Sequence, residues 1–142
     1  MANNRGFTLV ELLVAVGIIG VLASISIVSV GSIRSKARDA RRLADVKQVQ
    51  NALELVFNDY EKYPVQATEG TYKLICNGEV ADACTTDPDK TYMAMPVNPM
   101  PNGTAYKYKS ADGLTYSFVF TLENTTNGLA AGAHTASPTG VQ

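Results

Sequence analysis

The sequence predicts an α+β fold in which one long N-terminal α-helix packs against a small antiparallel β-sheet. Three observations lead to this prediction. Residues 12–33 form an apolar run of 22 residues without a charged side chain. The stretch that follows has no proline or glycine until Pro64 and places apolar residues at helical spacing. From residue 65 onward, alternating segments are separated by turn residues, as in β-hairpins.

Charge is distributed unevenly along the 142 residues, although the formal net charge is only −1. Residues 34–47 contain six basic and two acidic side chains, whereas residues 48–142 contain five basic and ten acidic ones. The long apolar run before them cannot be buried in a domain this small, which argues against a soluble monomer. The composition also excludes collagen-like, coiled-coil-only and low-complexity proteins.

The apolar run predicts a transmembrane helix, because roughly 20 apolar residues suffice to cross a bilayer. Its serines can hydrogen-bond back to the helix backbone and therefore do not prevent insertion. A secretory signal peptide is the alternative, but its apolar stretch is shorter, roughly 7–15 residues, and ends in a small-x-small cleavage site. The basic residues after the run would by themselves place the C-terminal side in the cytoplasm.

A single carboxylate lies at the start of this segment. Glu11 follows Phe7–Val10 and directly precedes the uncharged run. A carboxylate at membrane depth is costly unless a cation pairs with it, so Glu11 is a candidate functional residue. The alternative is a glutamate at the level of the lipid headgroups, where its charge costs little.

The octapeptide from Arg5 to Leu12 resembles the N-terminus of type IV pilins and pseudopilins. It has a short leader that ends in Gly6, a phenylalanine at the start of the apolar helix, and a glutamate four residues beyond it. The resemblance implies that a prepilin peptidase cleaves between Gly6 and Phe7 and methylates the new amino terminus. It also implies that Glu11 pairs with the terminal amine of a neighbouring subunit, an attraction that is strong in apolar surroundings.

The resemblance divides the chain into four parts and implies a pilin-like fold. These are a leader peptide at 1–6, a transmembrane and filament-core helix at 7–33, an amphipathic helix at 34–63, and the β-sheet part of the globular domain at 64–142. The subunit would first span the cytoplasmic membrane once, with its C-terminal domain outside. It would then join an extracellular filament or a periplasmic pseudopilus. This orientation is the opposite of the one expected from the basic residues after the apolar run, which would place the C-terminal side in the cytoplasm.

The implied function is that of a prepilin polymerised into a type IV pilus-like filament for adhesion, motility or DNA uptake. The major pseudopilin of a type II secretion system is an alternative. An uncleaved, membrane-anchored binding domain is an alternative of another class, and it leaves Gly6, Phe7 and Glu11 unexplained. The implied partners are further copies of the chain, the prepilin peptidase, the membrane before assembly, and an inner-membrane assembly platform with its ATPase.

Neither a catalytic site nor a cofactor is expected. His134 is the one histidine, no serine or cysteine nucleophile has a recognisable partner, and no phosphate-binding loop is present. Asp82, Asp87 and Asp89 are weak calcium candidates, for which solvated loop acids are the simpler interpretation.

The apolar helix departs from its relatives at one position. Many family members carry a proline in its second half, where this chain has Val28. Gly17, Gly20 and Gly31 are weak points, each costing about 1 kcal/mol in helix propensity. The sequence leaves open whether the helix melts around Gly17 and Gly20 in a filament.

The apolar spacing after the run predicts that one helix covers roughly residues 8–59 and ends near Pro64. Its apolar face comprises Val46, Val49, Leu53, Val56, Phe57 and Tyr60. The polar side chains expected elsewhere are Asp39, Arg42, Lys47, Gln48, Asn51 and Glu54. The basic cluster at 34–47 fits a solvated face, with a pair between Asp39 and Arg42, or a contact with acidic surfaces of adjacent subunits. Binding of nucleic acid is an alternative role for this basic cluster, and nothing else in the sequence supports it.

The C-terminal part carries strand patterns and two cysteines. Strands are expected at Thr71–Cys76, Thr104–Lys109, Leu114–Leu122 and Gly132–Ala136, the second and third forming a hairpin around Ala111–Gly113. Seven residues separate Cys76 from Cys84. In an exported domain this spacing favours a disulfide over free thiols, and one histidine with two cysteines does not complete a zinc site.

Overall fold

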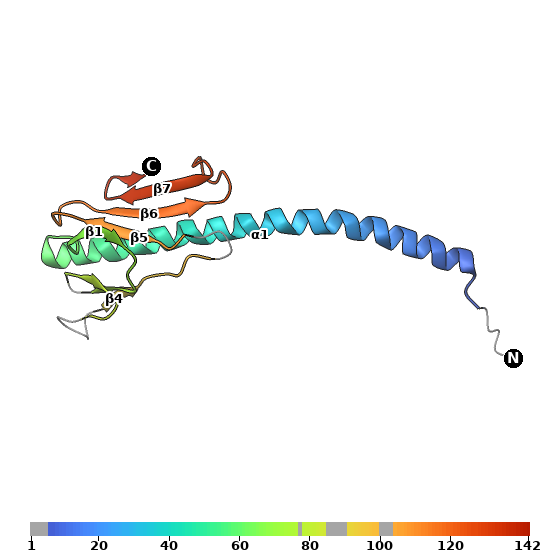
Figure 1. The fold of residues 1–142 in the computed structure, drawn as a ribbon, viewed down its shortest axis with the longest axis horizontal. Helices are drawn as coiled ribbons and strands as arrows, with labels where there is room; N and C mark the ends of the chain where they lie inside the picture. The colour runs from blue at the N-terminus through green and yellow to red at the C-terminus, as the bar shows by residue number, and fades with distance from the viewer. Residues whose placement is uncertain (1–5, 77, 85–90, 100–103) are drawn as a thin grey trace. The chain divides into compact units, whose positions relative to one another are not determined.

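The computed structural model describes residues 6–76, 78–84, 91–99 and 104–142, and the side chains of residues 25–29 lie outside this description. The chain forms two compact units, residues 1–35 and residues 36–142. Helix α1 (Leu9–Tyr60) contributes its first part to one unit and its second part to the other (Figure 1). The prediction of one helix across residues 8–59, followed by an antiparallel sheet, is confirmed.

The first unit exposes its large apolar side chains. Phe7 is 80% exposed and Leu9 is 78% exposed. A Cβ atom added at Gly17 or Gly20 would meet nothing within 4 Å. Within the residues that the structure describes, no helix is both long enough and apolar enough to cross a membrane. The span expected at residues 12–33 therefore stays a prediction, and the side chain of Val28 lies outside the described residues.

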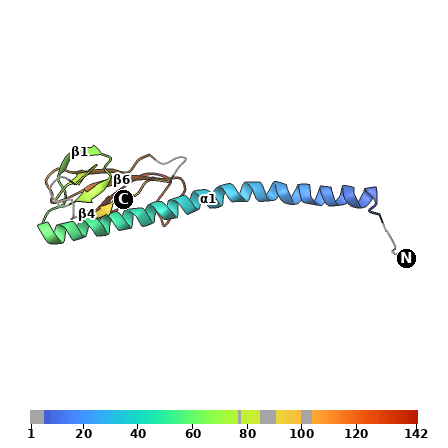
Figure 2. The ribbon, with the colours of Figure 1, turned by 90° about the horizontal axis from the view of Figure 1, so that it is seen from below.

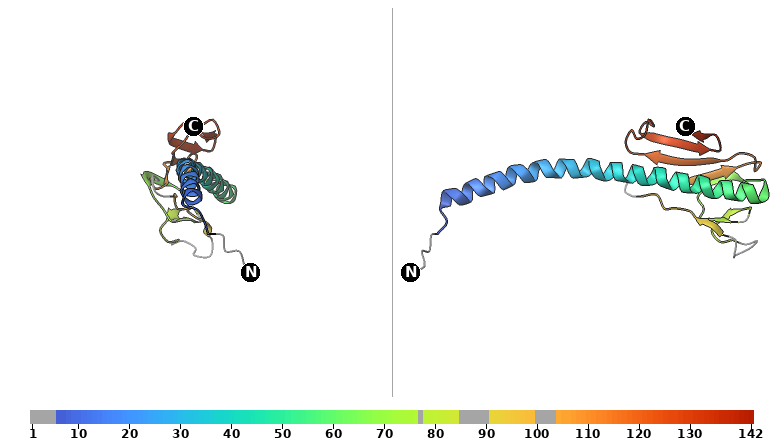
Figure 3. Two further views of the ribbon diagram at one scale, coloured as in Figure 1. Left: turned by 90° about the vertical axis from the view of Figure 1, so that its right-hand side faces the viewer. Right: turned by 180° about the vertical axis from the view of Figure 1, so that it is seen from behind.

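In the second unit, residues 36–60 of α1 pack against two antiparallel sheets. Figure 2 shows both sheets on one side of this helical segment, whereas in Figure 1 and in the right panel of Figure 3 the larger sheet lies above the segment and the smaller sheet below it. The larger sheet has the strand order β1-β5-β6-β7-β8, and the smaller one has the order β3-β2-β4. The strands are β1 (Gln66–Gly70), β2 (Leu74–Cys76), β3 (Val80–Ala81), β4 (Thr91–Ala94), β5 (Lys107–Ser110), β6 (Ser117–Leu122), β7 (Gly132–Ser137) and β8 (Gly140–Val141).

The expected hairpin is present as β5 and β6, with Tyr108 opposite Phe118. Both strands are shorter than expected because the turn is wider. The backbone N–H of Gly113 donates to Ser110 Oγ, and Asp112 Oδ1 accepts from the N–H groups of Leu114 and Thr115. The expected strand at 132–136 is confirmed as β7, and only the last three residues of the segment at 71–76 are extended. The short strands β1, β3, β4 and β8 were not predicted.

The core lies between α1 and the inner face of β6. Val46, Val49, Leu53 and Val56 are buried on the helix, and they pack with Phe118, Phe120 and Leu122, which alternate along β6. The predicted apolar face of the helix is therefore confirmed. Burial of such side chains contributes about 1.5–3 kcal/mol each. The helix ends at Tyr60, after which Glu61 adopts a left-handed φ of 56° and donates its N–H to Phe57 O.

One part of the helix prediction is wrong. Asp39 and Arg42 were expected on a solvated face, and both are 0% exposed. They lie on the same side of α1 as Val46 and Val49. Residues 98–99, after β4, and residues 123–124, after β6, cover them there. Lys47, Gln48, Asn51 and Glu54 are exposed, as expected.

Candidate processing and assembly site

The N-terminal candidate residues lie at the beginning of α1. Gly6 and Phe7 precede the helix, are exposed and have no regular secondary structure. Thr8 caps the helix, which begins at Leu9. The bond between Gly6 and Phe7 is therefore in accessible backbone outside the helix, a conformation that a peptidase can bind.

Thr8 and Glu11 form a reciprocal capping box. The Thr8 N–H and hydroxyl donate to Glu11 Oε2 at 2.9 and 2.7 Å, and the Glu11 N–H donates to Thr8 Oγ1 at 3.3 Å. These bonds satisfy helix N–H groups that otherwise lack partners. This capping role was not predicted from the sequence, although Thr-x-x-Glu before an apolar run is a pattern typical of a capping box. The Glu11 carboxylate is thus oriented by hydrogen bonds within its own chain before a cation pairs with it.

The second unit contains a buried polar network. The pair between Asp39 and Arg42 was predicted from the sequence and is confirmed, whereas its burial and its other partners were not predicted. Arg42 donates to Asp39 Oδ1 at 2.7 Å, to Asn98 Oδ1 at 2.8 Å and to the backbone oxygen of Pro99 at 2.8 Å. It also donates to Glu123 Oε1, which Arg38 contacts as well. This Asp39–Arg42 network consists of Arg38, Asp39, Arg42, Asn98, Glu123 and Asn124.

The network joins α1 to two distant loops. The Asp39 carboxylate accepts the backbone N–H groups of Glu123 and Asn124, at 2.9 and 2.8 Å, just beyond β6. Asn98 Nδ2 donates to Thr104 O, which connects the network to the described residues just before β5. Every buried charge in it therefore has a partner, as burial of charge requires.

The carboxylates of this network are stabilised in their ionised form. Two arginines beside Glu123, Arg38 foremost, lower the pKa of Glu123 to about 2 despite partial burial. Burial alone would raise the pKa of Asp39, but hydrogen bonds from Glu123, Asn124 and Arg42 outweigh it and lower that pKa. Both groups stay charged at neutral pH, so the network remains intact there.

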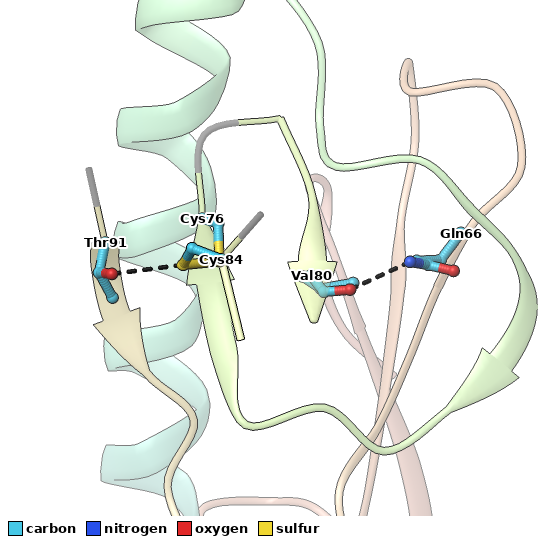
Figure 4. Close-up of a disulfide and its surroundings, with 5 residues drawn as sticks. All are labelled: Gln66, Cys76, Val80, Cys84 and Thr91. Carbon is cyan, nitrogen blue, oxygen red and sulfur yellow. Dashed lines mark hydrogen bonds between the residues drawn. A yellow bond between two sulfur atoms is a disulfide. The ribbon is translucent and has the colours of Figure 1, made fainter. Parts of the chain in front are cut away.

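The expected disulfide between Cys76 and Cys84 is present (Figure 4). It fastens the segment after β3 to the buried strand β2. The Thr91 hydroxyl of β4 lies 3.3 Å from Cys84 Sγ, and Gln66 Nε2 donates to Val80 O at 3.0 Å. The bridge and the Thr91 contact link the short strands of the smaller sheet, and the Gln66 bond joins that sheet to β1 of the larger one.

Removal of this disulfide is expected to lower the free energy of unfolding by about 2–3 kcal/mol, because a short closed loop restricts the unfolded chain. The measurement is denaturant unfolding of the full chain, comparing the wild type with Cys76→Ala/Cys84→Ala. The reduced wild type serves as control, since it keeps both sulfur atoms. Equal stability of the oxidised and reduced wild type would contradict the expectation.

The structure supports no functional role for the described residues among the remaining candidates, which are the three aspartates and His134. Asp82 is exposed, and the described residues contain no group of three acidic, histidine or cysteine side chains that could hold a metal. Asp87 and Asp89 lie outside the described residues, so the calcium interpretation is untested. The ring nitrogens of His134 contact the backbone oxygens of Ala130, at 2.7 Å, and Gln142, at 3.1 Å, which is a structural position in β7.

Comparison with known proteins shows that the N-terminal residues match a known family. Residues 1–31 match the family described as "Prokaryotic N-terminal methylation motif". The chain is 38% identical over 73 residues to "Type II secretion system core protein G" of Escherichia coli (strain K12), which covers 51% of this chain and 50% of that protein. It is 33% identical over 67 residues to "Type IV major pilin protein PilA" of Myxococcus xanthus, covering 47% and 30% of the two chains.

The chain belongs to the type IV pilin and pseudopilin family. A further family member, "Type II secretion system core protein G" of Pectobacterium carotovorum, is 30% identical over 106 residues, covering 74% of this chain and 66% of that protein. The matches to the Escherichia and Myxococcus proteins span half or less of their length. No solved structure matches the chain. Pilins and pseudopilins are structural, membrane-anchored proteins of surface or periplasmic filaments.

Proposed function

We propose that this chain is a prepilin that is cleaved between Gly6 and Phe7, methylated on Phe7, and polymerised into a type IV pilus-like filament. The filament would serve adhesion, motility or DNA uptake. The observation that carries the proposal is the methylation-motif match over residues 1–31, together with an exposed, non-helical bond at the expected cleavage point. Family membership supports the helical homopolymer and processing by a prepilin peptidase.

The apolar first unit is the proposed membrane and filament-core segment. Its exposed apolar side chains require a non-aqueous partner, and lipid before assembly and neighbouring subunits after it both provide one. Glu11 then pairs with the amine of Phe7 in a neighbouring subunit. The further proposed partners are the inner-membrane assembly platform and its ATPase. The C-terminal unit lies outside the cytoplasmic membrane, an orientation that the disulfide supports.

The second candidate is the major pseudopilin of a type II secretion system. It is favoured by the names of the Escherichia and Pectobacterium relatives, both called core protein G. Neither candidate requires a catalytic group or cofactor in the chain. An uncleaved, membrane-anchored binding domain is the competing proposal of another class.

The deciding measurement is the intact mass of the protein recovered from filaments. The expected mass is that of Phe7–Gln142 plus one methyl group and less two hydrogen atoms, since the chain holds one disulfide. A full-length mass, found only in membranes, would overturn the filament proposal in favour of the anchored binding domain.

The location of the processed form separates the two filament candidates. Filaments sheared from the surface of cells at native expression, with loss of adhesion, motility or DNA uptake on deletion, would support the pilus. A periplasmic processed form, with loss of protein secretion on deletion, would support the pseudopilus.

A further inference from the structure

A pocket lies at the junction of the smaller and the larger sheet. Its lining comes from the segment before β2, the segment after β4, and positions in or next to β5 and β6: residues 71–73, 95–98, 105–106, 108 and 118. The volume of this junction pocket is about 320 Å³. Sites for small molecules have volumes of about 300–1,000 Å³, so the junction pocket has room for a small ligand.

The floor of the junction pocket consists of aromatic rings that the protein holds in place. Tyr106 donates its hydroxyl to Asp45 Oδ2 at 2.8 Å, and Tyr108 donates to Pro64 O at 2.8 Å. The ring centroids of Tyr106 and Phe118 are 5.3 Å apart. Because both hydroxyl groups are satisfied inside the protein, these three residues present aromatic carbon to a ligand.

The walls of the pocket are held by hydrogen bonds within the second unit. The backbone N–H of Met95 donates to Lys73 O at 2.7 Å, which joins the wall before β2 to the wall after β4. Asn98, at the end of the second wall, accepts from Arg42 and donates to Thr104 O. A site that is already formed loses little conformational freedom when a ligand binds, which favours affinity.

Tyr72 forms the side of the pocket next to β1. Its hydroxyl donates to Gln66 Oε1 at 3.3 Å. A Cβ atom at Gly70 would lie 2.6 Å from the Tyr72 hydroxyl oxygen, so glycine at this position leaves room for the ring. The protein therefore builds this side of the pocket by its own packing.

The lining carries one positive charge. Lys73 lines the pocket, is exposed, and takes part in none of the ion pairs among the described residues. None of the described residues that line the pocket is acidic. Val97, which is 80% exposed, adds apolar surface to the lining. An apolar ligand with one anionic group therefore matches both the aromatic floor and the lysine.

We propose that the junction pocket binds a small aromatic or aliphatic carboxylate. Its apolar body lies on the rings of Tyr106 and Phe118, and its carboxylate pairs with Lys73. At the roughly 30 Å³ that one water molecule occupies, the pocket holds a ligand of about ten non-hydrogen atoms. This ligand site is additional to the proposed function, because neither processing nor assembly requires it.

The test uses the full chain in detergent micelles, labelled with ¹³C in the methionine methyl groups. The probe is 3-phenylpropanoate, and Met95→Leu identifies the signal of Met95, which lines the pocket. The carboxylate is expected to shift this signal saturably, with a Kd of about 1 mM or lower. The uncharged 3-phenylpropanamide has the same size and is expected to bind about three- to fivefold more weakly, since it cannot pair with Lys73.

Three variants assign the binding to the pocket. Lys73→Gln is expected to reduce the affinity for the carboxylate to that for the amide, whereas Lys109→Gln, an exposed lysine outside the lining, is expected to change neither. Ala105→Phe places a ring in the pocket from an exposed position and is expected to abolish the Met95 shift. Near-ultraviolet circular dichroism shows whether each variant keeps the wild-type fold.

Three results would overturn the inference. The first is the absence of a saturable Met95 shift at about 10 mM carboxylate. The second is an unchanged shift in folded Ala105→Phe, which would place the probe elsewhere. The third is equal affinity of the carboxylate and the amide, or an unchanged carboxylate affinity in Lys73→Gln, which would indicate a neutral apolar ligand. The experiment needs no filament, so its failure leaves the proposed function unaffected.

Discussion

Replacement of Asp39 by alanine is expected to lower the free energy of unfolding of the second unit by about 3–5 kcal/mol. Asp39 is 0% exposed and accepts hydrogen bonds from Arg42 and from the backbone of Glu123 and Asn124. The substitution leaves a buried guanidinium with reduced compensation and removes the Asp39 acceptor from the backbone N–H groups of Glu123 and Asn124. An unsatisfied buried donor costs about 1–3 kcal/mol, so the two N–H groups account for part of this total.

The measurement is denaturant unfolding of the full chain, followed by near-ultraviolet circular dichroism of the tyrosines in the second unit. Arg41→Ala, one residue before buried Arg42 and itself exposed, is the matched control, and it is expected to change stability by less than about 0.5 kcal/mol. A loss for Asp39→Ala as small as that of the control would contradict the role assigned to the network.

The same variant has an expected pH dependence. The pKa values of Asp39 and Glu123 are lower in the folded chain than in the unfolded one. The stability that they contribute is therefore complete above their unfolded pKa values and is lost as the pH falls toward about 2, the folded pKa of Glu123. The wild type should thus lose more stability than Asp39→Ala between about pH 5 and pH 2.

Substitution of Glu11 by glutamine is expected to reduce filament yield by at least about a hundredfold, since loss of one partner from a buried ion pair costs about 3–5 kcal/mol. Glutamine can still accept from Thr8 and so preserves the capping box. The substitution therefore removes the charge and keeps the local helix start.

Thr8→Val is the matched variant, because it removes the capping hydroxyl and keeps the Glu11 charge. It is expected to weaken the helix start by about 1 kcal/mol and to leave most of the filament yield. The readouts are the amounts of sheared filament and of cleaved subunit retained in the membrane. Normal assembly of Glu11→Gln would reject the ion-pair role, and a greater loss for Thr8→Val would assign the function of Glu11 to capping.

The main features of the fold could be predicted because they depend on local patterns. Spacings of three and four residues predicted the buried side of α1, and Asp112-Gly113 between alternating segments predicted the hairpin of β5 and β6. The strands that were missed, such as β1 with the sequence Gln-Ala-Thr-Glu-Gly, carry no apolar alternation. Their extended form comes from pairing with a neighbouring strand, and the pairing is decided by the rest of the fold.

The Asp39–Arg42 network illustrates the limit most clearly. Asp39 and Arg42 continue the spacing of Val46, Val49 and Leu53 toward the N-terminus, so they occupy the side of the helix that faces the sheet. This spacing was a usable signal, but polar side chains at such positions are ordinarily solvated. Their burial depends on Asn98 and Glu123, which lie 56 and 81 residues from Arg42.

The sequence by itself determined the order of segments and the processing motif, because helix periodicity, the apolar run and the residues around Gly6 are local properties. Only the tertiary structure decided which charges are neutralised inside the protein and which stay on its surface. Arg42 and Arg41 are adjacent and chemically identical, yet one is buried in a network and the other is exposed. The difference arises because the sheet and the segments after its strands cover the side of the helix that carries Arg42 and leave Arg41 exposed.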